Sequence, residues 1–356
     1  MTTRKQIAFW LFVFAFTIGF IWLFNDILMP FILGLIFGYL LDPVTDKLEA
    51  VKIPRGLAAL LVLTGFFTTL ILILALLFPV LEAQFVRMAE MLPTYLATAK
   101  TELQNFANSY LQPYMNIDSI STQELGSRYG ERALAWLTEA LKGVWTGGQA
   151  IFSLISLLVI TPVVAFYLLR DWDKMTAKIS SFLPARNKDL IHSILHDIDQ
   201  ALSGFLRGQA IVCLLLGLFY AIGLSAVGLE FGLLIGLFIG IVSFIPYVGA
   251  IFGGILCLGL ALLQFGALMP VVIVAIIFAV GQFLEGNILS PKFVGDNVNL
   301  HPVWILFALM AGGSLFGFTG VLIAVPIAAV IGVLVRYALR HYEQTDIYKG
   351  RRKIKK

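Results

Sequence analysis

The chain has 356 residues, of which 59% are hydrophobic and 13% are charged, with a formal net charge of +4 and a mean hydropathy of +0.92. Soluble domains carry about 25% charged residues, so the composition excludes a water-soluble domain and indicates an integral membrane protein. The positive charge does not indicate nucleic-acid binding, because eight of the 25 basic residues lie in 336–356, without an aromatic platform.

Uncharged stretches predict the membrane-spanning helices in chain order. One crossing takes about 20 apolar residues. The stretch 231–284 is long enough to be counted twice, so the pattern predicts an all-α polytopic membrane protein with about eight transmembrane helices, re-entrant or broken in the C-terminal half. The stretches are 7–24, 27–41, 57–81, 143–169, 208–229, 231–284 and 297–335.

The hydrophilic segments between these stretches divide the chain into six parts. Apolar residues recur at helical spacing in both interrupting segments, which indicates amphipathic helices. The expected parts are three N-terminal spans in 1–81, an extracytoplasmic helical segment in 82–142, a fourth span in 143–169, a cytoplasmic helical segment in 170–207, a membrane transport region in 208–340 and a basic tail in 341–356.

Basic residues at both ends of the chain predict the orientation. Arg4 and Lys5 precede the first span, which we expect to stay uncleaved because no small-residue cleavage site follows it. Lys349–Lys356 carries six basic residues. Positive charge favours the cytoplasmic side, so both termini are expected in the cytoplasm, with the tail close to anionic lipid.

A break is predicted within 231–284. Pro246 removes a backbone donor and Gly249 permits unusual φ, on either side of Tyr247. Irregular backbone at membrane depth is tolerated only where it is buried in protein or lines a cavity. The break therefore marks a place where function is expected.

Glycines at four-residue intervals precede this break. Such a stripe lets membrane helices approach closely, and we favour close packing over a direct transport role. The residues are Gly228, Gly232, Gly236 and Gly240.

A second break is predicted in 311–320. Four glycines within nine residues do not suit a helix interior, and the surrounding stretch of 39 residues exceeds one crossing. We expect a re-entrant helical hairpin with a glycine tip, with a long kinked helix as the alternative. The residues are Gly312, Gly313, Gly317 and Gly320, followed by Pro326.

Ionisable residues are scarce between 208 and 335. Glu285 ends an apolar stretch, with Gln282, Asn287 and Lys292 nearby and Pro291 interrupting helical continuity. Ionisable groups within a membrane region are costly and are functional by default. Glu285 is therefore either a proton-coupling group or an anchor at the membrane interface.

Enzyme signatures are not found in the sequence. There is no Gly-x-x-x-x-Gly-Lys-Ser/Thr loop for ATP, and His192 and His196 lack the intervening Glu of a zinc hydrolase. The sequence predicts neither an enzyme nor a cofactor or metal site.

Four segments, taken together, resemble the autoinducer-2 exporter family, which includes PerM-type permeases. The resemblance implies a bacterial inner-membrane permease with about eight spans, homo-oligomers that are plausibly pentameric, and alternating access. The segments are Ser203-Gly-Phe-Leu-Arg-Gly-Gln209, Ser243-Phe-Ile-Pro-Tyr-Val-Gly249, Glu285-Gly-Asn-Ile-Leu-Ser-Pro-Lys-Phe-Val-Gly295, and Leu300-His-Pro302 with the glycines and Pro326 that follow.

The resulting hypothesis is secondary transport of a small polar solute or ion. The substrate is expected where the break at 246–249 meets the glycine hairpin, with Arg207 and Gln209 facing the same region. Two alternatives stay open: a cation/proton antiporter that uses Glu285, and a non-transporting membrane scaffold that binds a partner through 82–142.

Overall fold

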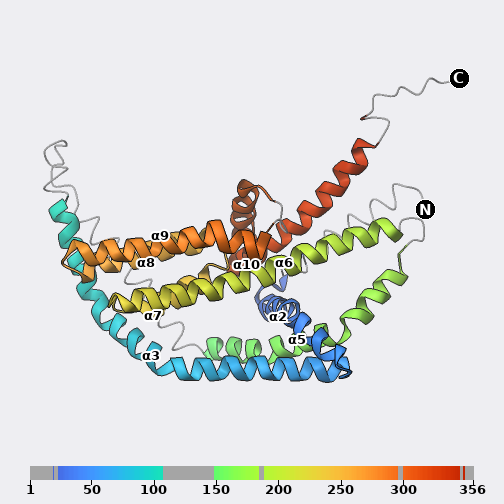
Figure 1. Ribbon diagram of the computed structural model, residues 1–356, viewed down its shortest axis with the longest axis horizontal. Helices are drawn as coiled ribbons and strands as arrows, with labels where there is room; N and C mark the ends of the chain where they lie inside the picture. The colour runs from blue at the N-terminus through green and yellow to red at the C-terminus, as the bar shows by residue number, and fades with distance from the viewer. Residues whose placement is uncertain are drawn as a thin grey trace. The chain divides into compact units, whose positions relative to one another are not determined.

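The computed structural model describes residues 19, 23–106, 148–183, 188–295, 300–344 and 348 (Figure 1). All of its assigned elements are helices. Almost all of the predicted first span (7–24), the predicted outer segment beyond residue 106 and most of the basic tail lie outside the described residues. The assigned helices are α2 (Asn25–Ala50), α3 (Arg55–Phe106), α5 (Gly148–Ser181), α6 (Lys188–Ala226), α7 (Gly232–Val242), α8 (Val248–Gln264), α9 (Leu268–Leu284), the π-helix η3 (Glu285–Val294) and α10 (Pro302–Glu343).

The helices confirm a polytopic all-α membrane protein. In the described part of the chain, five helical stretches are long and apolar enough to cross a membrane, and α7 and α8 are shorter apolar helices. The stretch 231–284, expected to hold two crossings with an irregular part, is divided into three helices. The breaks at 243–247 and 265–267 separate them.

Several helices continue through the boundaries predicted from charge. α3 has 52 residues, or roughly 78 Å at 1.5 Å per residue, and it passes Pro79 and Pro93 without ending. α5 continues past residue 170, and α6 continues past residue 207. Amphipathic and apolar segments therefore share single helices.

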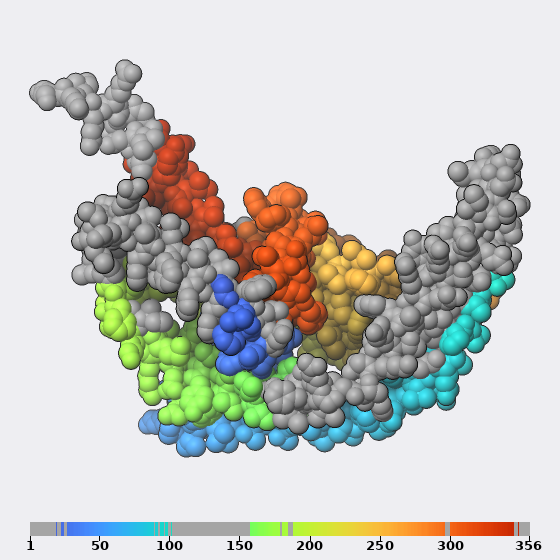
Figure 2. Space-filling view, turned by 180° about the vertical axis from the view of Figure 1, so that it is seen from behind, coloured from blue at the N-terminus to red at the C-terminus, as the bar shows by residue number. Residues whose placement is uncertain are grey.

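The exposed face of α3 is apolar. Leu76 is 70% exposed and Phe78 is 60% exposed, in a run that also exposes Ile71 and Leu72. The light-blue surface in Figure 2 belongs to this helix. Contiguous exposed apolar surface of this kind marks an interaction with other protein or with membrane, and here it suits contact with lipid.

By packing, the chain forms two units. Unit 1 comprises Met1–Phe67, Ser156–Ile211 and Ile288–Lys356, and unit 2 comprises Thr68–Ile155 and Val212–Asn287. α3, α5 and α6 contribute residues to both.

The core of unit 1 is formed by α2, α3 and α5. Leu41, Leu63 and Leu169 are buried there, and the rings of Phe37, Phe66 and Phe67 pack around them. The Thr161 hydroxyl of α5 donates to the carbonyl of Pro30 in α2 at 3.3 Å. α10 also packs against α2.

Unit 2 depends on close approach between α7 and the end of α6. A side chain at Gly236 would overlap the backbone of Ala221, and one at Gly240 would overlap the backbone of Gly217. A side chain at Gly232 would lie 2.8 Å from the backbone of Leu224. Gly232, Gly236 and Gly240 therefore serve the close packing that the sequence predicted, whereas a Cβ at Gly228 would meet nothing within 4 Å.

Polar side chains hold the turn between α6 and α7. Gly228 and Phe231 have positive φ in this turn. Gln264 donates to the Gly228 carbonyl at 2.9 Å and accepts from the Glu230 amide at 2.8 Å. The Tyr95 hydroxyl donates to the Glu230 carboxylate, and partial burial together with this carboxylate raises the pKa of Tyr95 to about 12.

Candidate functional site

The predicted break in unit 2 is a tight turn between two helices. α7 ends at Val242 and α8 begins at Val248, with Tyr247 at φ +68°. α7 has 11 residues, or about 16 Å, roughly half the thickness of a hydrocarbon core. Pro246 and Gly249 lie at this turn, and Gly249 packs so closely against Ser243 that a side chain would overlap it. The sequence-predicted break is confirmed.

The predicted glycine hairpin in unit 1 is also confirmed. Within α10, Phe316 and Gly317 leave helical geometry, and Gly317 has φ +57° and ψ −139°. A side chain at Gly312 would lie 2.5 Å from the carbonyl oxygen of Gly320, although eight residues of straight helix would separate them by about 12 Å. The chain therefore folds back on itself at the tip.

Small residues permit this reversal. Gly312 and Gly320 face each other across the hairpin, and a side chain at Gly313 would lie 3.0 Å from Val321. Pro326 lies on the second arm. Two helical arms in backbone contact leave the tip at Phe316–Gly317 as the place where helical backbone geometry is interrupted.

Glu285 directly follows α9 as the first residue of η3, lies in unit 2 and has a polar neighbour. Gln282 donates to the Glu285 carboxylate at 3.1 Å and to the Tyr220 hydroxyl at 3.2 Å. The Tyr220 hydroxyl in turn donates to the Phe278 carbonyl at 3.3 Å. Gln282 is thus the partner that the sequence predicted.

In the described part of the chain, two other residues that the sequence placed near Glu285, Asn287 and Pro291, make no hydrogen bond to its carboxylate. Asn287 donates to the Phe283 carbonyl at 3.1 Å. Pro291, expected to interrupt the helix, lies inside the π-helix η3. Tyr220 is fully buried and was not predicted, because nothing distinguishes it within the apolar stretch 208–229.

Arg207 lies in unit 1 and contacts α2. Its Nε donates to the Tyr39 carbonyl at 2.8 Å, and its Nη2 lies 3.4 Å from Oδ2 of Asp42. Gln209 is buried. Between them, Gly208 packs against the backbone of Phe293 and Val294, so two of the four segments of the family resemblance touch.

Arg55, at the start of α3, is the centre of an ion-pair network that the sequence did not predict. Its guanidinium lies 3.2 Å from Asp42, 3.0 Å from Glu49 and 2.6 Å from Asp173. Its Nε donates to the Leu169 carbonyl at 2.8 Å. Asp42 therefore joins two arginines, Arg55 and Arg207.

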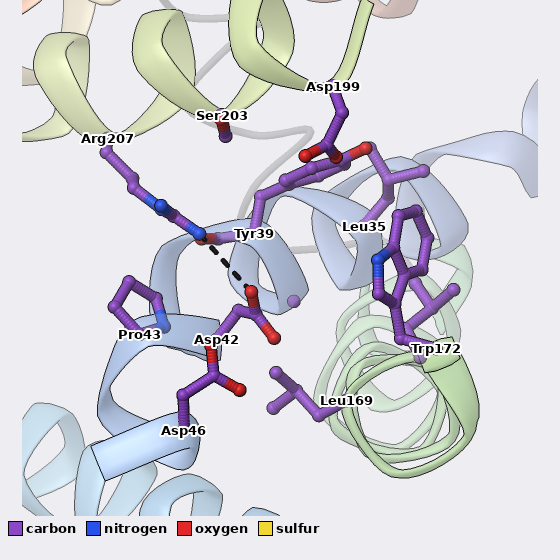
Figure 3. Close-up of a pocket in the computed structure, with 12 residues that line it drawn as sticks. Leu35, Tyr39, Asp42, Pro43, Asp46, Leu169, Trp172, Asp199, Ser203 and Arg207 are labelled. Atoms are coloured by element: carbon purple, nitrogen blue, oxygen red, sulfur yellow. Dashed lines mark hydrogen bonds and ion pairs between the residues drawn. The ribbon is translucent and has the colours of Figure 1, made fainter. Parts of the chain in front are cut away.

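A cavity of about 180 Å³ opens beside this network, between α2, α5 and α6. Figure 3 shows Arg207 pointing toward Asp42, with Tyr39, Trp172 and Asp199 gathered on the opposite side. Asp46 and Ser203 complete the polar lining. We call this the α2–α5–α6 pocket.

The predicted site residues fall in separate groups. Pro246, Tyr247 and Gly249 form one turn in unit 2, where Gln282 and Glu285 form a second group. Arg207, Gln209 and the glycine hairpin belong to unit 1. The expected meeting of the two breaks, with Arg207 beside them, stays a prediction.

Long apolar helices combined with two broken-helix elements define the class: a multi-pass α-helical membrane protein of the kind used for transport. The family model for AI-2E family transporters matches residues 11–340. The chain belongs to this family of transporters.

Curated relatives agree with this assignment. The chain is 31% identical over 321 residues to "Putative transport protein YrrI" of Bacillus subtilis, covering 89% of this chain and 88% of the relative. "Putative transport protein YueF" of the same organism is 30% identical, covering 88% and 84%. "Putative permease PerM" of Escherichia coli K12 is 27% identical, covering 89% of each.

Proposed function

We propose that this membrane transporter is a secondary transporter that exports a small polar solute of the autoinducer-2 type by alternating access. The observation that carries the proposal is the reversal at Phe316–Gly317, with Gly312 and Gly320 in contact across the hairpin. Discontinuous helices bind substrates in secondary transporters because their ends present unpaired backbone groups and dipole charge.

The turn between α7 and α8 supports the same proposal. Tyr247 is in an unusual backbone conformation, and α7 is too short to cross a membrane. Backbone of this kind is tolerated at membrane depth where it is buried or lines an aqueous path. The two breaks would then form the transport path.

The proposal also covers the membrane location, the orientation and the oligomeric state of the protein. We place the protein in the bacterial inner membrane with both termini in the cytoplasm, because the basic residues lie at the chain ends. The basic tail would lie near anionic lipid. Homo-oligomers, pentamers among them, follow from the family resemblance.

Flux into proteoliposomes tests the proposal. Labelled autoinducer-2 is compared with sodium and with proton movement under imposed gradients, using empty liposomes as the control. Solute flux driven by an ion gradient supports the proposal. Sodium-for-proton exchange without solute flux favours the antiporter, and no flux of any kind favours a scaffold that acts through 82–142.

A second candidate function is cation/proton antiport through Glu285. The observation that favours it is the partly buried Glu285 carboxylate, whose hydrogen-bond donor is the neutral amide of Gln282. Among the described residues, Glu285 makes no ion pair within 4 Å. A carboxylate without a neighbouring cation can exchange its proton without first breaking an ion pair.

Glu285→Gln tests this role, because it keeps the shape of the side chain and removes its charge. If Glu285 couples transport to protons, the variant reaches the membrane normally and its flux no longer depends on a proton gradient. Glu230→Gln, at an exposed turn, is the matched control. Identical pH profiles for wild type and Glu285→Gln would remove this residue from the mechanism.

A further inference from the structure

The α2–α5–α6 pocket has a chemical character distinct from the two helix breaks. Its aromatic wall is formed by Tyr39 and Trp172, whose rings pack edge to face with centroids 5.5 Å apart. Trp172 is the larger surface, and both residues line the cavity (Figure 3). A corner of two aromatic rings offers negative π-faces to a cationic group.

The charges that line the pocket are mainly negative. Asp42, Asp46 and Asp199 supply three carboxylates, whereas Arg207 supplies one guanidinium. Asp42 is already joined to Arg55 and Arg207. Asp199 has a weaker partner, the Tyr39 hydroxyl, and makes no ion pair within the described part of the chain.

The carboxylates are distributed around the cavity. Within the described residues, no three His, Cys, Asp or Glu side chains converge closely enough to hold a metal ion. Spread negative charge beside aromatic rings suits a bulky cation with diffuse charge better than a small inorganic ion.

The size of the pocket sets the size of the ligand. Its volume is about 180 Å³, and a protein cavity of about 150 Å³ admits benzene. A ligand with roughly six to eight non-hydrogen atoms therefore fits. One end of the pocket is polar, where Ser203 and Arg207 could hydrogen-bond a hydroxyl or carbonyl oxygen.

We propose that the α2–α5–α6 pocket binds a small organic cation, with an ammonium group against Trp172 and Tyr39 and near the Asp199 carboxylate. None of the residues at the two helix breaks lines this pocket. A flux measurement decides whether the cation is transported or regulates transport. An equilibrium titration decides whether the cation binds at all. Failure of one proposal is therefore distinguishable from failure of the other.

Isothermal titration of the purified full chain in detergent tests the proposal, with tetramethylammonium and choline as probes and sodium chloride at matched ionic strength. Both organic cations should bind saturably, and sodium should not displace them. Trp172→Ala should weaken binding about tenfold, the scale of a desolvated cation–π contact, whereas Trp172→Phe should retain most of it. Asp199→Asn should weaken it as well.

Matched controls separate binding from folding. Trp304→Ala removes an exposed tryptophan of α10, and Asp189→Asn removes a carboxylate from the first turn of α6. Neither residue lines the pocket, so both variants should bind like the wild type. Absence of saturable binding, displacement by sodium at equal concentration, or equal losses in Trp172→Ala and Trp304→Ala would overturn the proposal. If Trp172→Ala does not fold, the other two variants test the proposal: Trp172→Phe should retain most of the binding, and Asp199→Asn should weaken it.

Discussion

Arg55 contacts four carboxylates and one backbone carbonyl, and its position explains why. It lies at the start of α3, facing the last turns of α2 and the carboxyl-terminal half of α5. Its side chain is 15% exposed. A guanidinium presents five donors in a planar fork, so it can serve several carboxylates and a carbonyl at once.

Replacing Arg55 by Ala should destabilise the protein more than replacing an exposed arginine. The change leaves Asp42, Glu49 and Asp173 without their shared cation and should lower the free energy of unfolding by about 1.5–3 kcal/mol. Thermal unfolding in detergent measures the loss. Arg170→Ala, which breaks an exposed pair with Asp171 at 3.7 Å, should cost about 0.2–1 kcal/mol. Equal losses in the two variants would show that the network adds nothing.

At the residue scale, the sequence predicted contacts that are local and missed those that are distant. Gln282 and Glu285 are three residues apart on one helix, so their hydrogen bond follows from helical geometry. Arg55 and Leu169 are 114 residues apart. The pattern of neither segment predicts this pairing. From the sequence, the basic residues of 42–56 indicate only positive charge beside a membrane-spanning helix.

Gly317 should be intolerant of any side chain for a reason confined to the backbone. Its φ is +57° with ψ −139°, a combination that non-glycine residues avoid, and a Cβ there would meet no atom within 4 Å. Gly317→Ala therefore introduces strain without overlap, about 1–3 kcal/mol, or a roughly 5- to 150-fold shift away from the hairpin.

Proteoliposome flux at matched protein density measures the effect of Gly317→Ala, which should fall with the hairpin population. Gly65→Ala is the control, because a Cβ at Gly65 also meets nothing within 4 Å but lies in the regular helix α3. Full transport by Gly317→Ala would show that the hairpin tip plays no part in the path.

Gly236 tests close packing between α6 and α7. A Cβ at Gly236 would overlap the backbone of Ala221, so Gly236→Ala should force the two helices apart and cost about 1–3 kcal/mol of stability. Gly259→Ala in α8, where a Cβ meets nothing within 4 Å, should stabilise by up to about 1 kcal/mol. Opposite signs for the two thermal shifts are expected, and a stable Gly236→Ala protein would contradict the packing.

At the element scale, breaks were predictable and continuity was not. Proline and glycine act on the backbone at their own positions, so Pro246, Gly249 and the four glycines within 312–320 marked both breaks. Pro79 and Pro93 carry the same signal, yet α3 continues through them. A proline can be accommodated in a long helix when neighbouring groups re-satisfy the freed carbonyl, and the sequence does not show where this happens.

Orientation is the prediction that belongs to the whole molecule. In a variant with Cys213 and Cys257 replaced by serine, Thr101→Cys should react with an impermeant maleimide in intact spheroplasts, and Thr176→Cys should react only after lysis. Both positions are exposed. The expectation rests on positive charge at the chain ends. Reversed labelling would place both termini outside the cytoplasm.

For the molecule as a whole, composition was enough to predict the class of protein. It was not enough to predict how the helices pack against one another. The apolar stretches established a multi-pass helical membrane protein, because length and hydropathy decide whether a helix can span a bilayer. The division into two packed units and the pocket between α2, α5 and α6 arise from pairing between distant segments. Such pairing leaves no local trace in one sequence.

The Arg55 network also bears on how the chain is made. Ribosomes add about 5–20 residues per second, so Leu169, which is 114 residues after Arg55, is synthesised roughly 6–23 s later. Among the described residues, the partners of Arg55 that exist during that interval are Asp42, Asp46 and Glu49, all from the preceding helix. The early hairpin of α2 and α3 is thus held at its charged end before α5 exists. Asp173 and the Leu169 carbonyl then add contacts from α5, which fix the position of that helix against α2 and α3.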